Sequence, residues 1–147
     1  MRRIYIIYAG GMKEDYFRQA TQEYIKRLGA EFRIENIEIK EGQGLEREAD
    51  RILDKLGKLG RVYKIALDRE GARMSSEKFA ELLYGGSAQP VAFIIGSSHG
   101  LAESVKRAAD FRLSFSDMTF PHSLFRVMLM EQVYRAYMIE NGRSYHK

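Results

Sequence analysis

The sequence has no cysteine, only two prolines and only three histidines. Without cysteine the chain forms no disulfide, no zinc–thiolate site and no thiol nucleophile. His99, His122 and His146 lack the spacing of metal ligands, so we expect no metal cofactor. Long apolar runs are missing too, because the one near the N-terminus ends at Lys13 and Glu14, too early for a signal peptide or a membrane span. These absences predict a cytoplasmic protein with no membrane partner.

Length and composition favour one folded domain. The chain has 147 residues, of which 45% are hydrophobic and 30% are charged. At roughly 150 residues a domain buries about 68–70% of the surface of its unfolded chain, so we expect a single domain over residues 1–147. The net charge of +4 favours a polyanionic partner without requiring one.

The apolar pattern predicts strands and helices in alternation. β-Branched and aromatic runs predict strands over residues 2–9, 32–39, 62–67, 90–95 and 111–116. Apolar residues at three- and four-residue spacing predict helices over residues 16–28, 45–56, 102–109 and 121–141, and a further helix with Ser75 as its N-cap. Such alternation is typical of an α/β fold with a mostly parallel sheet and helices on both faces, in which ligands bind at the carboxyl ends of the strands.

Three local features refine this prediction. The apolar residues of 32–34 alternate in the opposite phase to those of 37–39, which predicts a bulge or an early break in the second strand. Residues 68–71 are rich in turn formers and predict the end of the third strand. The strand over residues 90–95 is apolar without alternation, as expected for an interior strand covered on both faces.

The segment Gly96-Ser97-Ser98-His99-Gly100 follows the interior strand and precedes a helix. Its backbone N–H groups and small side chains suit a nucleotide-like ligand. A tight turn that needs glycine for a positive φ is an equally good interpretation. The segment does not match the G-x-G-x-x-G pattern of dinucleotide sites. Gly10-Gly11-Met12 is too short a candidate for a flavodoxin-like phosphate loop.

The helix predicted over residues 121–141 is apolar nearly all round. One face carries Leu124, Val127, Met128, Glu131, Tyr134, Arg135 and Met138. Most of the other face is covered by Phe125, Leu129, Met130, Val133, Ala136 and Tyr137. In so small a domain, such a helix indicates packing on the sheet with one side and on a second subunit with the other. It therefore predicts a homodimer.

Two charged residues and the C-terminal tail are candidates for chemistry. Glu131 and Arg135 form either a local ion pair, worth roughly 0.3–0.5 kcal/mol if exposed, or part of a site at the dimer interface. The tail of Tyr145, His146 and Lys147 is either frayed or folds over an active site. In the second case the aromatic ring stacks on a base and the basic groups bind phosphate.

Four segments resemble a known family, namely ALDREG, IIGSSHGL, LSFSDMTFPHSLFRVMLMEQVYRAY and the terminal SYHK. With the less specific N-terminal region, they make nearly the whole chain similar to the ribosomal RNA large subunit methyltransferase H family, of the SPOUT class. The resemblance implies a single-domain SPOUT fold with a C-terminal trefoil knot. It also implies a homodimer that uses S-adenosylmethionine to methylate N3 of a pseudouridine in helix 69 of 23S ribosomal RNA, with the assembled ribosome as the expected substrate.

The resemblance also assigns residues. Cofactor binding falls to Leu67, Gly96, Phe115, Ser116, Asp117, Met118, Thr119 and Phe120. Catalysis falls to Glu131, Arg135, Tyr145 and His146. In this interpretation His146 or Glu131 accepts the N3 proton, whereas Arg135 and Lys147 bind phosphate or developing charge.

Some features leave alternatives open. Of the two phenylalanines that bracket residues 115–120, we expect at least one to fill the core instead of binding a ligand. Ser97 stands where the resembled family usually has a second glycine, so its side chain either points away from the cofactor or reshapes the loop. A non-catalytic, RNA-binding module of the ribosome is the alternative function that the basic, aromatic tail supports.

Overall fold

Five parallel strands form one sheet in the order β2-β1-β4-β3-β5, in the computed structural model, which describes residues 1–86 and 88–147. The strands are β1 (Arg2–Ala9), β2 (Phe32–Ile39), β3 (Tyr63–Arg73), β4 (Val91–Ile95) and β5 (Phe111–Ser114). The helices are α1 (Asp15–Leu28), α2 (Leu45–Lys58), α3 (Ser76–Tyr84), α4 (Glu103–Ala108) and α5 (His122–Glu140). The predicted α/β fold with a parallel sheet is confirmed.

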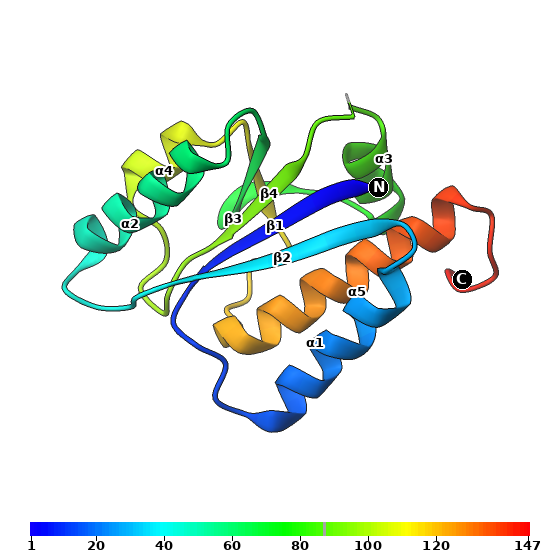
Figure 1. Cartoon of the computed structure of the whole chain (residues 1–147), viewed down its shortest axis with the longest axis horizontal. Helices are drawn as coiled ribbons and strands as arrows, with labels where there is room; N and C mark the ends of the chain where they lie inside the picture. The colour runs from blue at the N-terminus through cyan, green and yellow to red at the C-terminus, as the bar shows by residue number, and fades with distance from the viewer. Residues whose placement is uncertain (87) are drawn as a thin grey trace.

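Helices cover both faces of the sheet (Figure 1). α1, α3 and α5 pack on one face, around side chains such as Ile6 and Phe93. α2 and α4 pack on the other, around Ile7 and Ile94. β4 lies at the centre of the sheet and all of its residues are buried, which confirms the predicted interior strand.

β2 is one continuous strand, so the predicted bulge is wrong. Its pairing with β1 keeps a single register over residues 32–39. The apolar phase changes because Phe32 and Ile34 pack in the core under α1 and α5, whereas Ile37 and Ile39 pack in the core under α2. An edge strand that contributes to two cores changes its apolar phase without any irregularity in its backbone.

β3 does not end at residue 67 as predicted but continues to Arg73. Its register with β5 shifts between Leu67 and Ala72, and both of these residues lie opposite Leu113. Residues 68–71 therefore form a bulge within the strand instead of a turn at its end.

Close packing holds this bulge in place. The Asp68 carboxylate is buried and lies 3.7 Å from Lys106 Nζ and 3.5 Å from Arg112 Nη1. A Cβ at Gly71 would lie 2.6 Å from the carbonyl carbon of Arg112, so only glycine fits where the bulge crosses β5.

α5 packs against both α1 and α3 on one face of the sheet (Figure 1). Leu129, Met130 and Val133 are fully buried, so helices of the same chain and the sheet cover much of its apolar circumference. One stripe stays half-buried and is called here the open stripe of α5; it consists of Leu124, Val127, Met128, Glu131, Arg135 and Met138. The C-terminal knot implied by the resemblance stays a prediction.

Within residues 1–86 and 88–147, no helix has the length and apolar character needed to cross a membrane. The same residues contain no group of three or more histidine, aspartate or glutamate side chains placed to hold a metal ion.

Candidate active site

A cavity of about 660 Å³ lies at the carboxyl edge of the sheet, beside the bulge of β3 and the end of β4. Residues 67–70, 97–101 and 118–122 supply most of its lining. The predicted cofactor residues among them are Leu67, Met118, Thr119 and Phe120. Its volume falls within the roughly 300–1,000 Å³ that is usual for small-molecule sites. The structure thus brings together the bulge of β3 and two loops, three segments that lie far apart in the sequence.

Gly96 leads into the loop of residues 97–101, the second of these three segments. A Cβ at Gly96 would lie 2.6 Å from the carbonyl carbon of Gly100 and 3.0 Å from Leu101 Cδ2, so a side chain there would overlap the loop. The turn is closed by a hydrogen bond of 2.9 Å from the Gly100 N–H to the Ser97 carbonyl. The positive φ expected for this turn belongs to Gly100, at 83°. The segment is therefore both a tight glycine turn and a wall of the cavity.

The Ser97 side chain is held by α2, on the side of the loop that faces this helix. Its hydroxyl donates to Oε1 of Glu48 on α2 at 2.8 Å, and it accepts the N–H of His99 at 3.3 Å. The second oxygen of Glu48 accepts the N–H of Gly42 at 2.9 Å. Ser97 and Glu48 are both buried, so the hydroxyl serves the packing of the loop on α2. Of the two alternatives for this serine, the geometry favours the one in which its hydroxyl is not available to the cofactor.

Phe115 lies apart from the large cavity. β5 ends at Ser114, two residues earlier than predicted, and the Phe115 ring packs against that of Phe125 with their centroids 4.8 Å apart. Phe115 lines a second cavity, of about 300 Å³, together with Glu131. Because Phe125 lines the large cavity, this pair of rings lies between the two.

Ser116 and Asp117 shape the loop that follows β5. The Ser116 hydroxyl accepts the N–H of Met118 at 3.0 Å. Asp117 forms an exposed ion pair of 2.6 Å with Arg73, at the end of β3. Neither residue lines the large cavity, so of the predicted segment only residues 118–120 do so.

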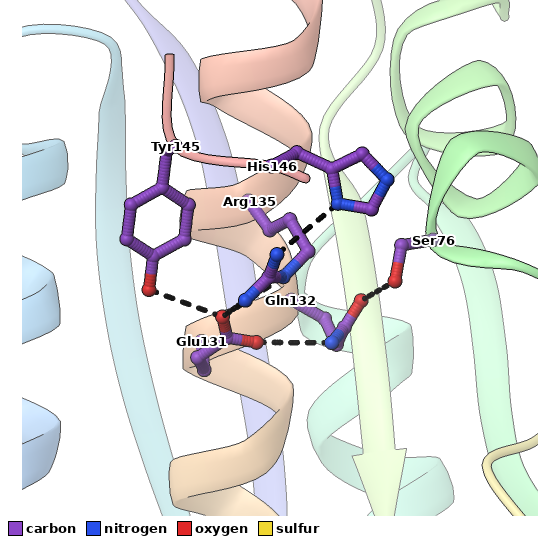
Figure 2. A network of polar contacts seen from close by, with 6 residues as sticks. All are labelled: Ser76, Glu131, Gln132, Arg135, Tyr145 and His146. Atoms are coloured by element: carbon purple, nitrogen blue, oxygen red, sulfur yellow. Dashed lines mark hydrogen bonds and ion pairs between the residues drawn. The ribbon is translucent and has the colours of Figure 1, made fainter. Parts of the chain in front are cut away.

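The four predicted catalytic residues lie together at α5 and the tail (Figure 2). Arg135 donates to Oε1 of Glu131 from Nε at 3.0 Å and from Nη2 at 2.6 Å. The Tyr145 hydroxyl donates to the same oxygen at 3.2 Å, and Nη1 of Arg135 lies 3.1 Å from Nδ1 of His146. The tail therefore folds back on α5 and is not frayed. We call these four residues the tail cluster.

The charges of the tail cluster follow from its contacts. The hydrogen bond to Glu131 raises the pKa of Arg135. Burial, and then the nearby Glu131 carboxylate, raise the pKa of the Tyr145 hydroxyl. Tyr145 is thus a neutral donor, and its ring packs edge-on against Tyr134 with centroids 4.9 Å apart.

Comparison with known proteins decides the family. A family model described as predicted SPOUT methyltransferase matches residues 2–146. The ribosomal RNA large subunit methyltransferase H of Caldicellulosiruptor bescii is 48% identical, over 98% of this chain and 99% of its own length. The chain belongs to the ribosomal RNA large subunit methyltransferase H family of SPOUT methyltransferases. The resemblance seen in the sequence is confirmed.

Solved structures support the SPOUT fold. A probable methyltransferase from Bordetella pertussis matches 92% of this chain and 94% of its own, with a TM-score of 0.60 at 14% identity. The methyltransferase AviRb from Streptomyces viridochromogenes, solved with S-adenosylmethionine, matches 91% of this chain and 57% of its own, with a TM-score of 0.50 at 10% identity. At such identities these likenesses concern the fold.

In this SPOUT methyltransferase, the cavity and the tail cluster lie at different levels of α5. His122 and Phe125, at its beginning, line the cavity, whereas Glu131 and Arg135 lie in its second half. At 1.5 Å per residue, His122 and Arg135 are roughly 20 Å apart along the helix axis. Arg135 of the tail cluster therefore lies well beyond the part of α5 that lines the cavity.

Three residues beside the tail cluster of this SPOUT methyltransferase were missed by the sequence analysis as site residues. Gln132 donates to Oε2 of Glu131 at 2.9 Å, and Ser76 donates to the Gln132 side-chain oxygen at 2.7 Å (Figure 2). Glu77 lies 2.6 Å from Nε2 of His146. In the sequence, Ser76 and Glu77 follow the predicted N-cap Ser75. Polar residues are common in the first turn of a helix, so their presence there gave no indication of a site.

Proposed function

We propose that this chain transfers the methyl group of S-adenosylmethionine to N3 of a pseudouridine in helix 69 of 23S ribosomal RNA, as a cytoplasmic homodimer. The observation that carries the proposal is the 48% identity, over 98% of the chain, to a ribosomal RNA large subunit methyltransferase H. Membership of a methyltransferase family favours this function over a non-catalytic RNA-binding module. A net charge of +4 suits an RNA partner.

The large cavity is the proposed cofactor site. When bound, S-adenosylmethionine supplies a methyl group already activated by the positive sulfur. Backbone groups beside Gly96, the apolar walls of Leu67 and Phe120, and the loop shaped by Ser116 to Thr119 would hold it, as the fit of a small molecule in about 660 Å³ allows. Phe115 would act indirectly, through its contact with Phe125.

The proposed homodimer forms along the open stripe of α5. A two-fold axis pairs this helix with its own copy in the partner, so an antiparallel pair brings the second half of one α5 to the beginning of the other. With Met128 at the crossing point, Glu131 comes level with Phe125 of the partner and Arg135 comes level with Pro121. This arrangement would complete each cavity with the tail cluster of the other subunit.

The tail cluster is the proposed substrate side. Either Glu131 or His146 accepts the proton that leaves N3. Arg135 and Lys147 bind phosphate or the negative charge that develops on the base. Tyr145 is near enough to Glu131 to fix its orientation, with its hydroxyl 3.2 Å from Oε1.

The test is methylation of ribosomes from cells that lack this protein. Purified protein with S-adenosylmethionine is expected to restore one methyl group on a pseudouridine of helix 69, detected by mass spectrometry of nuclease fragments. Assembled ribosomes and free 23S RNA are assayed in parallel to identify the substrate. Incorporation at another nucleotide, or no incorporation although calorimetry shows cofactor binding, would overturn the proposed substrate.

A further inference from the structure

Glu77 joins the C-terminal tail to α3. Its Oε1 lies 2.6 Å from Nε2 of His146, while the other ring nitrogen of His146 lies 3.1 Å from Nη1 of Arg135. Side chains from α3 and α5 therefore hold the imidazole from two sides. The hydrogen bond with His146 lowers the pKa of the Glu77 carboxyl, so Glu77 is ionised at neutral pH.

These two neighbours fix the position of the hydrogen on the ring. A guanidinium has only N–H donors, so Nδ1 of His146 accepts from Arg135. An ionised carboxylate only accepts, so Nε2 carries the hydrogen and donates to Glu77. Only a neutral imidazole with its hydrogen on Nε2 satisfies both contacts at once. The charged or titratable groups on this side of the ring are Glu77 from α3, Arg135 and Glu131 from α5, and Tyr145 from the tail.

The competing proton acceptor is already engaged. Oε1 of Glu131 accepts from Arg135 and Tyr145, and Oε2 accepts from Gln132. Nδ1 of His146 accepts from Arg135 and becomes a free acceptor once that guanidinium turns toward an RNA phosphate, whereas Glu131 then still accepts from Tyr145 and Gln132.

We propose that His146 accepts the substrate proton at Nδ1 and that Glu77 is the positioning residue that keeps the hydrogen of His146 on Nε2. This inference rests on the proposed function. As N3 of the base takes the methyl group, its proton passes to Nδ1, and the positive charge lost from sulfur appears on the imidazolium. The Nε2–H remains on the Glu77 carboxylate, which stabilises that charge. Arg135, released from Nδ1, pairs with phosphate.

The test compares Glu77→Ala and Glu77→Gln with the wild-type protein. Nitrogen NMR of the His146 ring is expected to show the Nε2–H tautomer in the wild type and a mixture of tautomers in Glu77→Ala. The kcat of Glu77→Ala is expected to fall about tenfold, part of the roughly 10²–10⁴-fold that general base catalysis contributes. Glu77→Gln keeps an acceptor oxygen and is expected to recover part of this loss. The cofactor Kd stays unchanged in both variants.

Glu81→Ala is the matched control, since Glu81 is on the same helix and about as exposed, with 67% of its side chain accessible against 58% for Glu77. It is expected to behave as wild type in both measurements. A wild-type tautomer and kcat in Glu77→Ala would overturn the inference about Glu77. If the wild-type protein itself transfers no methyl group to ribosomes, the proposed function fails, and the tautomer measurement still decides whether Glu77 positions His146.

Discussion

Single residues set the shape of the loop that begins at Gly96. The buried hydroxyl of Ser97 hydrogen-bonds to a buried carboxylate, Glu48, which also accepts the Gly42 N–H, so α2 and the loop before it are tied to the cavity wall. Hydrogen bonds to charged groups contribute about 1.5–3 kcal/mol each. Rigidity of this wall is useful to a cofactor site, because less ordering remains to be done on binding.

The glycine at position 96 provides a direct test of this wall. Gly96→Ala is expected to weaken S-adenosylmethionine binding at least about tenfold, or about 1.4 kcal/mol, because its Cβ would overlap the Gly100 carbonyl. Isothermal titration calorimetry measures the Kd. Gly57→Ala is the control, since a Cβ on this exposed glycine of α2 meets nothing within 4 Å. That change is expected to leave the Kd alone and to stabilise the fold by about 0.5–1 kcal/mol. An unchanged Kd in Gly96→Ala would contradict the assignment of the cavity.

At the scale of residues, the sequence predicted contacts between near neighbours in the chain better than contacts between distant residues. The spacing of Glu131 and Arg135 predicted an ion pair as one of two alternatives, and the two side chains do pair. The contact of Glu77 with His146 joins residues from two distant parts of the chain, so no local sequence pattern predicts it. Arg126 is similar: this cation on an apolar helix is buried over the ring of Tyr8, 3.4 Å from the centroid, in a contact between α5 and β1 that only the tertiary fold creates.

At the scale of elements, periodicity predicted the strands and helices well and failed where two cores or a bulge were involved. β1 begins and ends at the predicted residues, and Ser75 caps α3 by accepting the Lys78 N–H. The phase change in β2 and the bulge in β3 were misinterpreted because periodicity identifies which residues are buried but not against which layer they pack.

The end of α3 carries a pH-dependent contact. The Tyr84 hydroxyl donates to Glu31 at 3.4 Å, and burial, followed by the charge of Glu31, raises the pKa of Tyr84. Because the folded state then holds this proton more tightly than the unfolded state, the associated stability is complete below pH 10 and declines as the pH rises beyond it. Urea unfolding below and above pH 10 is expected to show a smaller loss in Tyr84→Phe than in wild type. Tyr16→Phe, on a side chain that is 66% exposed, serves as the control. Equal losses in all three proteins would contradict the prediction.

At the scale of the whole molecule, family and fold could be predicted from the sequence, whereas the joining of its parts could not. The resemblance assigned Leu67, Gly96 and residues 115–120 to one cofactor. The segments 67–70, 97–101 and 118–122 do meet at one cavity. Arg135 of the tail cluster lies roughly 20 Å along α5 from His122, which lines the cavity, because each residue of a helix adds 1.5 Å. The sequence had already offered a site at the dimer interface as one interpretation of Glu131 and Arg135, and the structure adds how far along α5 Arg135 lies from the cavity.

Val127 tests the proposed dimer. Val127→Glu puts a charge in the middle of the open stripe of α5, where it would be buried without a partner at a cost of about 3–5 kcal/mol. Sedimentation is expected to show at least about a 100-fold weaker dimer, and methyl transfer is expected to fall with the dimer fraction. The control is Tyr16→Glu, which adds the same charge at an exposed apolar residue of α1. A dimer of wild-type strength that retains full activity would refute the interface.

The position of β1 in the sheet has a consequence for how the chain folds. β1 pairs on one side with β2, which follows it closely, and on the other with β4, so that Ile4 lies beside Val91. During synthesis the first strand leaves the ribosome long before its second neighbour exists. The second edge of β1 stays unpaired until β3, α3 and then β4 have been synthesised. Parallel pairings between such distant segments slow folding. The sheet of this methyltransferase is therefore completed only after β4, its middle strand, has been synthesised.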